Sequence, residues 1–320
     1  MLVGASFQLL SKTQAMLIGS AQTVLSSLGY ELDCRSEAFG YLRDSSDLLS
    51  QPEQLRLRMQ EDGYLYLRGL LNPQWVWQAR FEIAAQLAAE GCLAVGSPMM
   101  DCIARPGLTM SFRPDIADSS PALKKLLYSG RMIEFFQVFL GGDVRHFDYT
   151  WLRAVAPGLG TYPHCDIVYM GRGTDKLYTA WTPLGNISWE LGGLMVLEKS
   201  HRLEKIKNRY GRMDVDSYCD NRQTAQLYAS GQKSWSGALS KNPVSLRQKY
   251  GGRWLSAEFE VGDVLIFSMF TIHASLDNHS QQIRLSSDSR YQRSKEPVDE
   301  RWVGTNPIGH SAAGKRGRIC

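Results

Sequence analysis

His164 and Asp166, separated by one residue, form a pair of potential metal ligands in the middle of the chain. In an extended strand, residues two apart point to the same side, so the imidazole and the carboxylate can reach one ion while Cys165 points away. His273 is a third candidate ligand, and Arg284 follows it. Two histidines and one carboxylate cover one face of an octahedral ion and leave positions open, as in non-haem Fe(II) oxygenases. The sequence therefore predicts an Fe(II) site.

Arg284 gives that site a way to hold an organic acid. Its planar guanidinium can pair with the distal carboxylate of a keto acid whose other end chelates the iron, and this recognition favours arginine over lysine. Arg290 lies six residues further on and can share a strand face with Arg284. Arg284 is preferred for its distance from His273, and Arg290 is kept as a reserve, with a substrate or structural role as its alternative.

A second His-x-Asp triplet, His146 to Asp148, competes for the metal role. The two triplets differ in context. His164 follows the turn-rich run 157–163, which would deliver its pair to the mouth of a barrel, where binding residues tend to lie. His146 opens the run 144–155, which is typical of an ordinary strand. We therefore assign the metal to the later triplet.

The choice of third ligand is also contested. His273 ends the strongly apolar run 262–270, which can carry a ligand into a barrel interior, whereas His279 lies in a polar turn and is expected to be a solvated loop residue. His201 and His310 have no carboxylate at strand spacing. We expect both to be hydrogen-bonded or exposed histidines without a metal role.

Several segments between residues 55 and 293 form a pattern that is more specific than any single motif. They are 61–71 (EDGYLYLRGLL), the glycine-rich approach to 164–166, 181–184 (WTPL) with 192–201 (GGLMVLEKSH), and 262–284. In these segments the chain resembles the phytanoyl-CoA dioxygenase family of Fe(II)- and 2-oxoglutarate-dependent oxygenases.

The resemblance assigns roles to individual residues. It implies iron ligands at His164, Asp166 and His273, a 2-oxoglutarate carboxylate on Arg284, and contacts to that co-substrate from Ser275, Trp181 and Tyr149. The last three have alternatives. Trp181 lies in an aromatic and β-branched run where a tryptophan is often plain core, and Ser275 could only cap a turn.

The order of elements predicts an α+β fold with a mostly β core. Short β-rich runs follow Val144, as in a double-stranded β-helix, a jelly-roll or cupin-like barrel flanked by helices. The helices are expected earlier in the chain. A first helix is expected within 11–28 and a third over 122–140. The second starts at Asn72-Pro73 and ends at Gly91. Its apolar stripe is expected at Trp77, Phe81, Ala84 and Ala88.

The chain is divided into three regions. Residues 1–54 are a partly helical extension outside the family resemblance, 55–300 form the oxygenase domain, and 301–320 are a C-terminal tail. The small basic run 315–318 in that tail is expected to be disordered. A polar stretch with dispersed aromatic residues, 203–256, is predicted to be an inserted loop over the barrel. A lid is favoured, with a surface elaboration or dimer contact as the alternative.

Composition is consistent with one enzyme domain. The chain has 320 residues, 43% of them hydrophobic, and a net charge of +4. That mild charge gives no dense basic stripe and argues against a nucleic-acid partner. No segment suits a membrane span or a secretory signal, and six cysteines without CxxC spacing fit neither a zinc ribbon nor a disulfide framework, which suits a reducing cytoplasm. A homodimer is left open.

These observations predict a dioxygenase that uses Fe(II), 2-oxoglutarate and O₂ to hydroxylate, or otherwise oxidise, a C–H bond of a small organic metabolite, with release of succinate and CO₂. Halogenating relatives carry a small residue in place of the carboxylate ligand, so Asp166 favours hydroxylation or a related oxidation. The alternative is a non-oxidative cupin-like metal-dependent isomerase or small-molecule binding protein, which would leave the spacing of Arg284 from His273 unexplained.

Overall fold

Two β-sheets form the centre of the molecule in the computed structural model, which describes residues 24–320. The larger sheet has the strand order β4 (Tyr64–Leu67), β11 (Val264–Ser268), β7 (Tyr178–Pro183), β13 (Arg284–Arg293) and β5 (Val144–His146), and β6 (Trp151–Val155) also pairs with β13. The smaller sheet has the order β12 (His273–Ser275), β8 (Leu194–Leu197), β10 (Trp254–Ser256) and β3 (Phe39–Tyr41).

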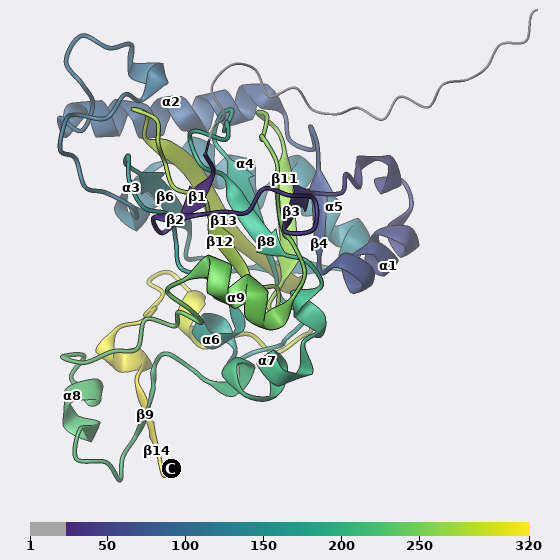
Figure 1. Cartoon of the computed structure of the whole chain (residues 1–320), viewed down its shortest axis with the longest axis vertical. Helices are drawn as coiled ribbons and strands as arrows, with labels where there is room; N and C mark the ends of the chain where they lie inside the picture. The colour runs from purple at the N-terminus through teal and green to yellow at the C-terminus, as the bar shows by residue number, and fades with distance from the viewer. Residues whose placement is uncertain (1–23) are drawn as a thin grey trace, which may run out of the picture.

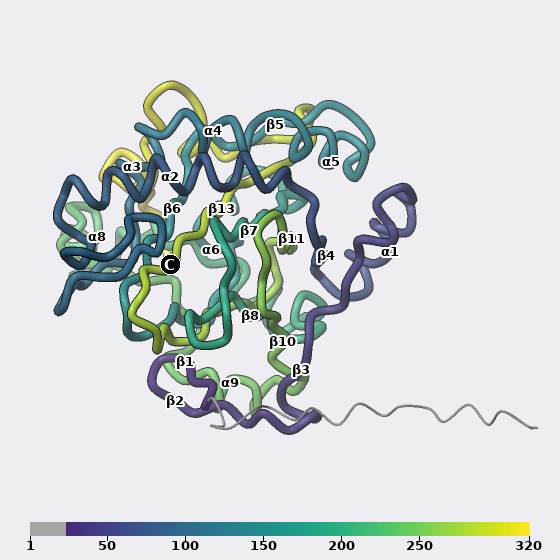
Figure 2. The backbone as a smooth tube through the Cα atoms, turned by 90° about the horizontal axis from the view of Figure 1, so that it is seen from above, coloured from purple at the N-terminus to yellow at the C-terminus, as the bar shows by residue number. Residues whose placement is uncertain are grey.

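Helices cover the outer face of the larger sheet. Successive strand residues face opposite sides, so Ala180 packs with the helices, whereas Trp181 packs with residues of the smaller sheet. The helices of this layer, all on one side of the sheet in Figure 2, are α2 (Pro73–Ala89), α4 (Pro121–Tyr128) and α5 (Gly130–Leu140). The inner faces of both sheets are therefore left to build a cavity.

Helix α2 begins where the sequence predicts, but it buries a different face. The Asn72 side chain accepts a hydrogen bond from the Gln74 amide at 2.8 Å and caps the first turn. Trp77 and Phe81 of the expected apolar stripe are 40% and 49% exposed. The buried stripe consists mainly of aliphatic residues, Val76, Ala79, Ile83, Ala84 and Leu87. Two apolar stripes lie side by side on this helix, and only the partner surface selects one.

Two other helix predictions need correction. The helix expected over 122–140 is divided at Ser129, whose extended backbone (φ −147°, ψ 176°) separates α4 from α5. Of the segment 11–28, residues 11–23 lie outside the described part of the chain. Its end is not helical, because Ser26–Ser27 form strand β1 and pair with β2 (Tyr30–Glu31).

The expected region boundaries fall inside structural elements. Helix α1 (Pro52–Asp62) spans the 54/55 boundary, and β3 of the extension joins the smaller sheet parallel to β10. Strand β10 belongs to the smaller sheet, so the last three residues of the predicted insertion, 203–256, are part of a sheet. The remaining elements are all short: α3 (Pro114–Ser119), α6 (Ile167–Met170), α7 (Glu204–Asn208), β9 (Ser217–Cys219), α8 (Ala225–Ala229), α9 (Pro243–Tyr250) and β14 (Arg316–Arg318).

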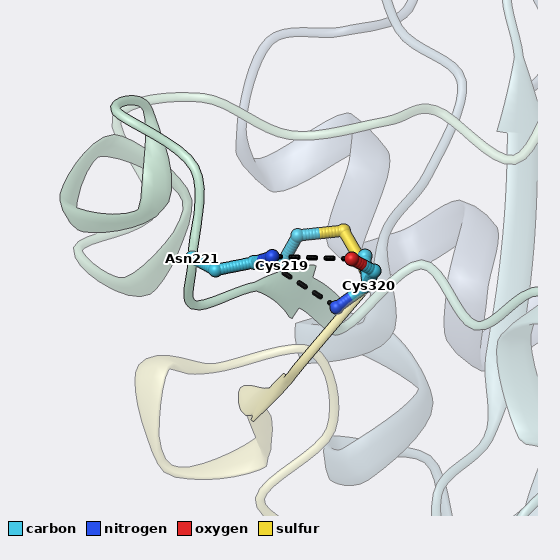
Figure 3. The surroundings of a disulfide bond; sticks show 3 residues. All are labelled: Cys219, Asn221 and Cys320. Atoms are coloured by element: carbon cyan, nitrogen blue, oxygen red, sulfur yellow. Dashed lines mark hydrogen bonds between the residues drawn. A yellow bond between two sulfur atoms is a disulfide. The ribbon is translucent and has the colours of Figure 1, made fainter.

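The C-terminal tail is ordered against the insertion, contrary to the prediction of a disordered tail. Strand β14 pairs in parallel with β9, and both lie beside α8 at one end of the molecule (Figure 1). A disulfide joins Cys219 to Cys320 (Figure 3). The side-chain amide of Asn221 donates to the Cys320 carbonyl at 3.1 Å and accepts from the Cys320 N–H at 3.2 Å. The cysteine spacing gave no sign of this bond because the two residues are 101 positions apart.

The disulfide bears on the predicted location. Disulfides are rare in cytosolic proteins, so the cytoplasmic prediction loses the support that it drew from unpaired cysteines. Among residues 24–320, no helix has the length and apolar character needed to cross a membrane.

Candidate metal and co-substrate site

The backbone brings His164 and His273 side by side. They form an isolated antiparallel bridge in which each amide donates to the carbonyl of the other residue, at 3.0 and 2.9 Å. His273 also opens β12, which pairs with Val196 of the central strand β8. Directly opposed residues of an antiparallel pair place their side chains close together on one face. The smaller sheet thus fixes both imidazoles.

Asp166 does not continue a strand from His164, contrary to the expectation from strand periodicity. Its backbone is helical (φ −65°, ψ −24°), and it is the N-cap residue that precedes the short helix α6. The Ile167 amide donates to the Met269 carbonyl at 3.1 Å and ties this turn to the loop before His273. His164 and Asp166 still face the same point, but a bridge followed by a helical turn produces this arrangement.

The three side chains present one donor atom each to a common point. The Nε2 atoms of His164 and His273 lie 3.8 and 3.7 Å from Asp166 Oδ1, and the three donor atoms all lie within 4.8 Å of one another. The Nδ1 atoms face the Tyr162 and Thr271 carbonyls at 2.7 and 3.0 Å. A carbonyl only accepts, so each Nδ1 carries the proton and each Nε2 is left as a lone-pair donor. This donor set fits Fe(II).

The site also has the protonation states that metal binding requires. Burial, together with the adjacent His273, lowers the pKa of His164 to about 3, and burial also lowers the pKa of His273. Burial alone would raise the pKa of Asp166, but the Arg290 guanidinium and the hydrogen bond from Thr179 help to hold it well below its usual range. At neutral pH the site therefore offers two neutral imidazoles and one carboxylate without releasing protons.

Two buried groups orient the Asp166 carboxylate. The Thr179 hydroxyl on β7 donates a short hydrogen bond to Oδ2, and Arg290 Nη2 on β13 lies 3.2 Å from the same oxygen. The Arg290 guanidinium also stacks over the Trp151 ring at 4.1 Å. Oδ2 is thus occupied by protein groups, and Oδ1 is the oxygen that faces the histidines. Arg290, the reserve candidate for the co-substrate, is already paired.

Thr179→Val is expected to weaken Fe(II) binding by about 10- to 100-fold, because it removes the hydroxyl that orients a ligand while it keeps the side-chain shape. The measurement is Fe(II) titration under anaerobic conditions. Thr182→Val is the matched control on the same strand, since the Thr182 hydroxyl is buried and has no hydrogen-bond partner among the described residues. Equal loss in both variants would contradict an orienting role for Thr179.

A cavity of 480 Å³ opens from the triad between the two sheets. Alternate residues of β6 and β13 line the cavity, because alternate side chains of a strand face the same side of the sheet. Its wall combines aromatic, aliphatic and charged side chains: Phe112, Trp151, Arg153, Val155, Leu159, Thr161, Tyr162, Tyr169, Met170, Trp181, Leu194, Arg284, Asp288, Arg290 and His310, beside the three metal-site residues.

Arg284 lies in this wall with unused hydrogen-bonding capacity. Its side chain is buried and donates to the Gly192 carbonyl, but its Nε has no hydrogen-bond partner, and among residues 24–320 no acidic side chain forms an ion pair with it. Burial lowers the pKa of Arg284 to about 10, so the guanidinium remains charged at neutral pH. A buried charge without a counter-charge is costly. An anion bound in the cavity would supply the missing partner.

Trp181 and Ser275, which were both predicted to contact the co-substrate, differ in their position relative to the cavity. Trp181 lines the cavity and also packs against Phe259 at 4.7 Å, so its side chain belongs to both the cavity wall and the core. The buried Ser275 hydroxyl accepts from the Thr161 amide at 2.8 Å. Ser275 is not among the residues that line the cavity, whereas Thr161 is.

Tyr149 is not among the residues that line the triad's cavity. The expected strand 144–155 is interrupted between β5 and β6, and Tyr149 lies in the interruption. With His146 and Asp148 it lines a separate cavity of 840 Å³. The competing His-x-Asp triplet therefore lines a different cavity from the triad, and Tyr149 adjoins the triad's cavity through the ring of Trp151, at 4.6 Å between centroids.

The remaining histidines are distributed as expected, with one exception. His279 is an exposed loop residue near the Ser26 hydroxyl, and His201 contacts the Gln60 carbonyl. His310, expected to have no part in the site, lies at the cavity instead. Nothing in the local sequence indicated this position, because a long-range fold of the tail creates it.

Comparison with known proteins identifies the family. The phytanoyl-CoA dioxygenase (PhyH) family matches residues 59–286, most of the chain. This chain belongs to the phytanoyl-CoA dioxygenase family. It is therefore an Fe(II)- and 2-oxoglutarate-dependent oxygenase that acts on a small molecule, and the cupin-like isomerase or binding protein is not supported.

Similar proteins are found among curated sequences and solved structures. A 1-deoxypentalenic acid 11-beta-hydroxylase of Streptomyces exfoliatus is 27% identical over 272 residues, which cover 78% of this chain and 84% of that protein. The epimerase SnoN, solved with Fe3+, alpha-ketoglutarate and nogalamycin RO, has a TM-score of 0.54 and 18% identity, over 81% of this chain and 93% of SnoN. EctD from S. alaskensis has a TM-score of 0.54 and 16% identity, over 93% of this chain and 99% of EctD. At these identities the structures show a shared fold.

Proposed function

We propose that this oxygenase hydroxylates a C–H bond of a cyclic, mainly apolar carboxylic acid. Fe(II) with 2-oxoglutarate and O₂ supplies the oxidising chemistry when bound, and succinate and CO₂ are the co-products. His164, Asp166 and His273 hold the metal on one face and leave the cavity side open. The protein's own contribution is to orient the reactants and to exclude water.

Arg284 is the residue that we assign to the far carboxylate of 2-oxoglutarate. Its unpaired, buried guanidinium in the cavity wall supports this role, whereas Arg290 is paired with Asp166. Trp181 forms part of the wall beside the co-substrate. Ser275 acts indirectly, because its hydroxyl holds the backbone of Thr161, and Thr161 lines the cavity.

The charge of the cavity carries the substrate proposal. Three guanidinium groups line it, against the two carboxylates of Asp166 and Asp288. The charges of Fe(II) and the 2-oxoglutarate dianion cancel, so the cavity keeps one formal positive charge after both bind. A site with excess positive charge favours an anionic ligand. The aromatic and aliphatic wall suits an apolar ring system, and the related hydroxylase is named for a carboxylic acid.

The finer features of the fold belong to the same proposal. We take the two facing sheets as a double-stranded β-helix of the jelly-roll type, and the insertion, which contributes Ser236 to the cavity, as a lid. A cytoplasmic location and a homodimer both remain expectations.

The test is a screen for substrate-stimulated succinate formation. The anaerobically Fe(II)-loaded protein receives 2-oxoglutarate, O₂ and a panel of cyclic terpenoid and polyketide acids that includes 1-deoxypentalenic acid. Each acid is paired with its methyl ester, which keeps the ring system and removes the charge. We expect at least one acid to raise succinate formation and to gain one oxygen atom by mass spectrometry, and its ester to be markedly weaker. Esters as active as their acids would contradict the anionic substrate.

A further inference from the structure

The C-terminal tail contributes a side chain to the cavity. His310 lines the cavity together with Tyr169, and its side chain is 38% exposed, so it lies at the mouth. The Tyr169 ring contacts the His310 ring at 5.9 Å and the His164 ring at 5.4 Å, measured between ring centroids. His310 is thus two aromatic contacts away from the metal site, on the exposed side of the cavity.

Asp216 determines which nitrogen of His310 is available. Its carboxylate is fully buried and lies 2.7 Å from His310 Nδ1. Burial alone would raise the pKa of Asp216, but the hydrogen bonds of His310 and Lys315 hold it well below its usual range. Asp216 is therefore an acceptor, and Nδ1 donates to it. Among the described residues none forms a hydrogen bond with Nε2, which is free for a ligand.

The fold holds this imidazole in one orientation. The chain between Arg301 and His310 forms a closed loop, because the Gly309 amide donates to the Arg301 carbonyl at 2.9 Å. The His310 ring packs edge-on against the buried Trp302 at 4.7 Å between centroids. A side chain held by a hydrogen bond and by ring packing is pre-organised for contact with a ligand.

A purely structural role for His310 explains less. Asp216 already accepts hydrogen bonds from Arg301 at 2.5 Å and Lys315 at 2.9 Å, so the buried carboxylate is paired without His310. Strand β14 and the disulfide to Cys219 hold the end of the tail. The histidine is therefore an additional polar group at the cavity mouth.

We propose that His310 Nε2 forms a hydrogen bond with an oxygen atom of the substrate and positions the substrate for oxidation. This proposal rests on the proposed function and adds a specificity-determining residue from outside the family match, which ends at residue 286. The oxygen lies on the part of the substrate that is distant from the oxidised carbon, because His310 lies at the mouth and the metal site at the inner end.

Three substitutions separate substrate contact from tail anchoring. In His310→Asn the amide can replace Nδ1 and keep the bond to Asp216, but nothing reaches the position of Nε2. In His310→Gln the longer amide reaches the Nε2 position. His310→Ala removes both. The probe is the panel acid that stimulates wild-type succinate formation most, assayed with the full-length Fe(II) protein.

For His310→Asn and His310→Ala we expect the KM for that acid to rise about 10- to 100-fold, the range for loss of a single hydrogen bond to a charged or polar group. The oxidised product per succinate should fall as well. His310→Gln should stay within about threefold of wild type. The KM for 2-oxoglutarate should change much less than the KM for the acid in every variant.

Wild-type behaviour of His310→Asn would overturn the proposal and leave only the anchoring role. A His310→Gln variant no better than His310→Asn would overturn it too, because the hydrogen bond could not then be the cause. Failure of the proposed function looks different, since wild-type protein would then show no stimulation by any panel acid.

Discussion

His164→Ala and His273→Ala are each expected to abolish substrate oxidation and to weaken Fe(II) binding sharply. Each removes one of three protein ligands whose donor atoms lie within 4.8 Å of one another. The opposed backbones at this bridge remain, because alanine keeps the amide and carbonyl that form it. The loss should therefore appear in metal titration without a comparable loss of thermal stability in the metal-free protein.

The controls are histidines that the structure places elsewhere. His146 lies in the separate cavity and stacks on Tyr128 at 4.2 Å, and His279 is an exposed loop residue. Alanine at either position should keep most of the activity and the Fe(II) affinity. An inactive His146→Ala with an active His164→Ala would show that the wrong triplet has been assigned to the metal.

The second large effect concerns Arg284. Loss of a bidentate, charge-assisted pair in Arg284→Ala should cost about 2 to 4 kcal/mol, or a roughly 30- to 1,000-fold weaker affinity for 2-oxoglutarate. Fe(II) affinity should be nearly unchanged, because Arg284 does not contact the triad. Arg284→Lys should recover only part of the loss, since lysine keeps the charge and lacks the planar fork. Binding to the anaerobic Fe(II) protein is the measurement.

Thermal denaturation gives an independent check on Arg284. A ligand that binds only the folded state stabilises it in proportion to the logarithm of its concentration over Kd. We expect 2-oxoglutarate to raise the Tm of the wild-type Fe(II) protein and to have little effect on Arg284→Met. The ligand-free variant should be at least as stable as wild type, because it no longer buries a guanidinium without an acidic partner.

Arg290→Met provides the contrast. Arg290 is paired with Asp166, so its loss should weaken Fe(II) binding before it affects 2-oxoglutarate. If Arg290→Met instead lost the co-substrate while Arg284→Ala kept it, the anchor would have been assigned six residues too early.

The chemistry of the site and the family can both be recognised from the residues alone. His164, Asp166 and His273 are residue types that bind metals, and they can be identified in the sequence without knowledge of the fold. The start of α2 at Asn72 was also predictable, because a cap is decided by neighbouring residues. The assignment of Arg284 over Arg290 was made on sequence distance alone.

Which side chains meet across the fold is not visible in the local sequence. Arg290 pairs with Asp166 across 124 positions, and His310 contacts Asp216 across 94. Local periodicity indicates which face of a helix or strand a side chain lies on. It does not indicate which other element that face packs against. For the same reason the buried stripe of α2 and the disulfide from Cys219 to Cys320 were not foreseen: each depends on contacts between segments that are far apart in the chain.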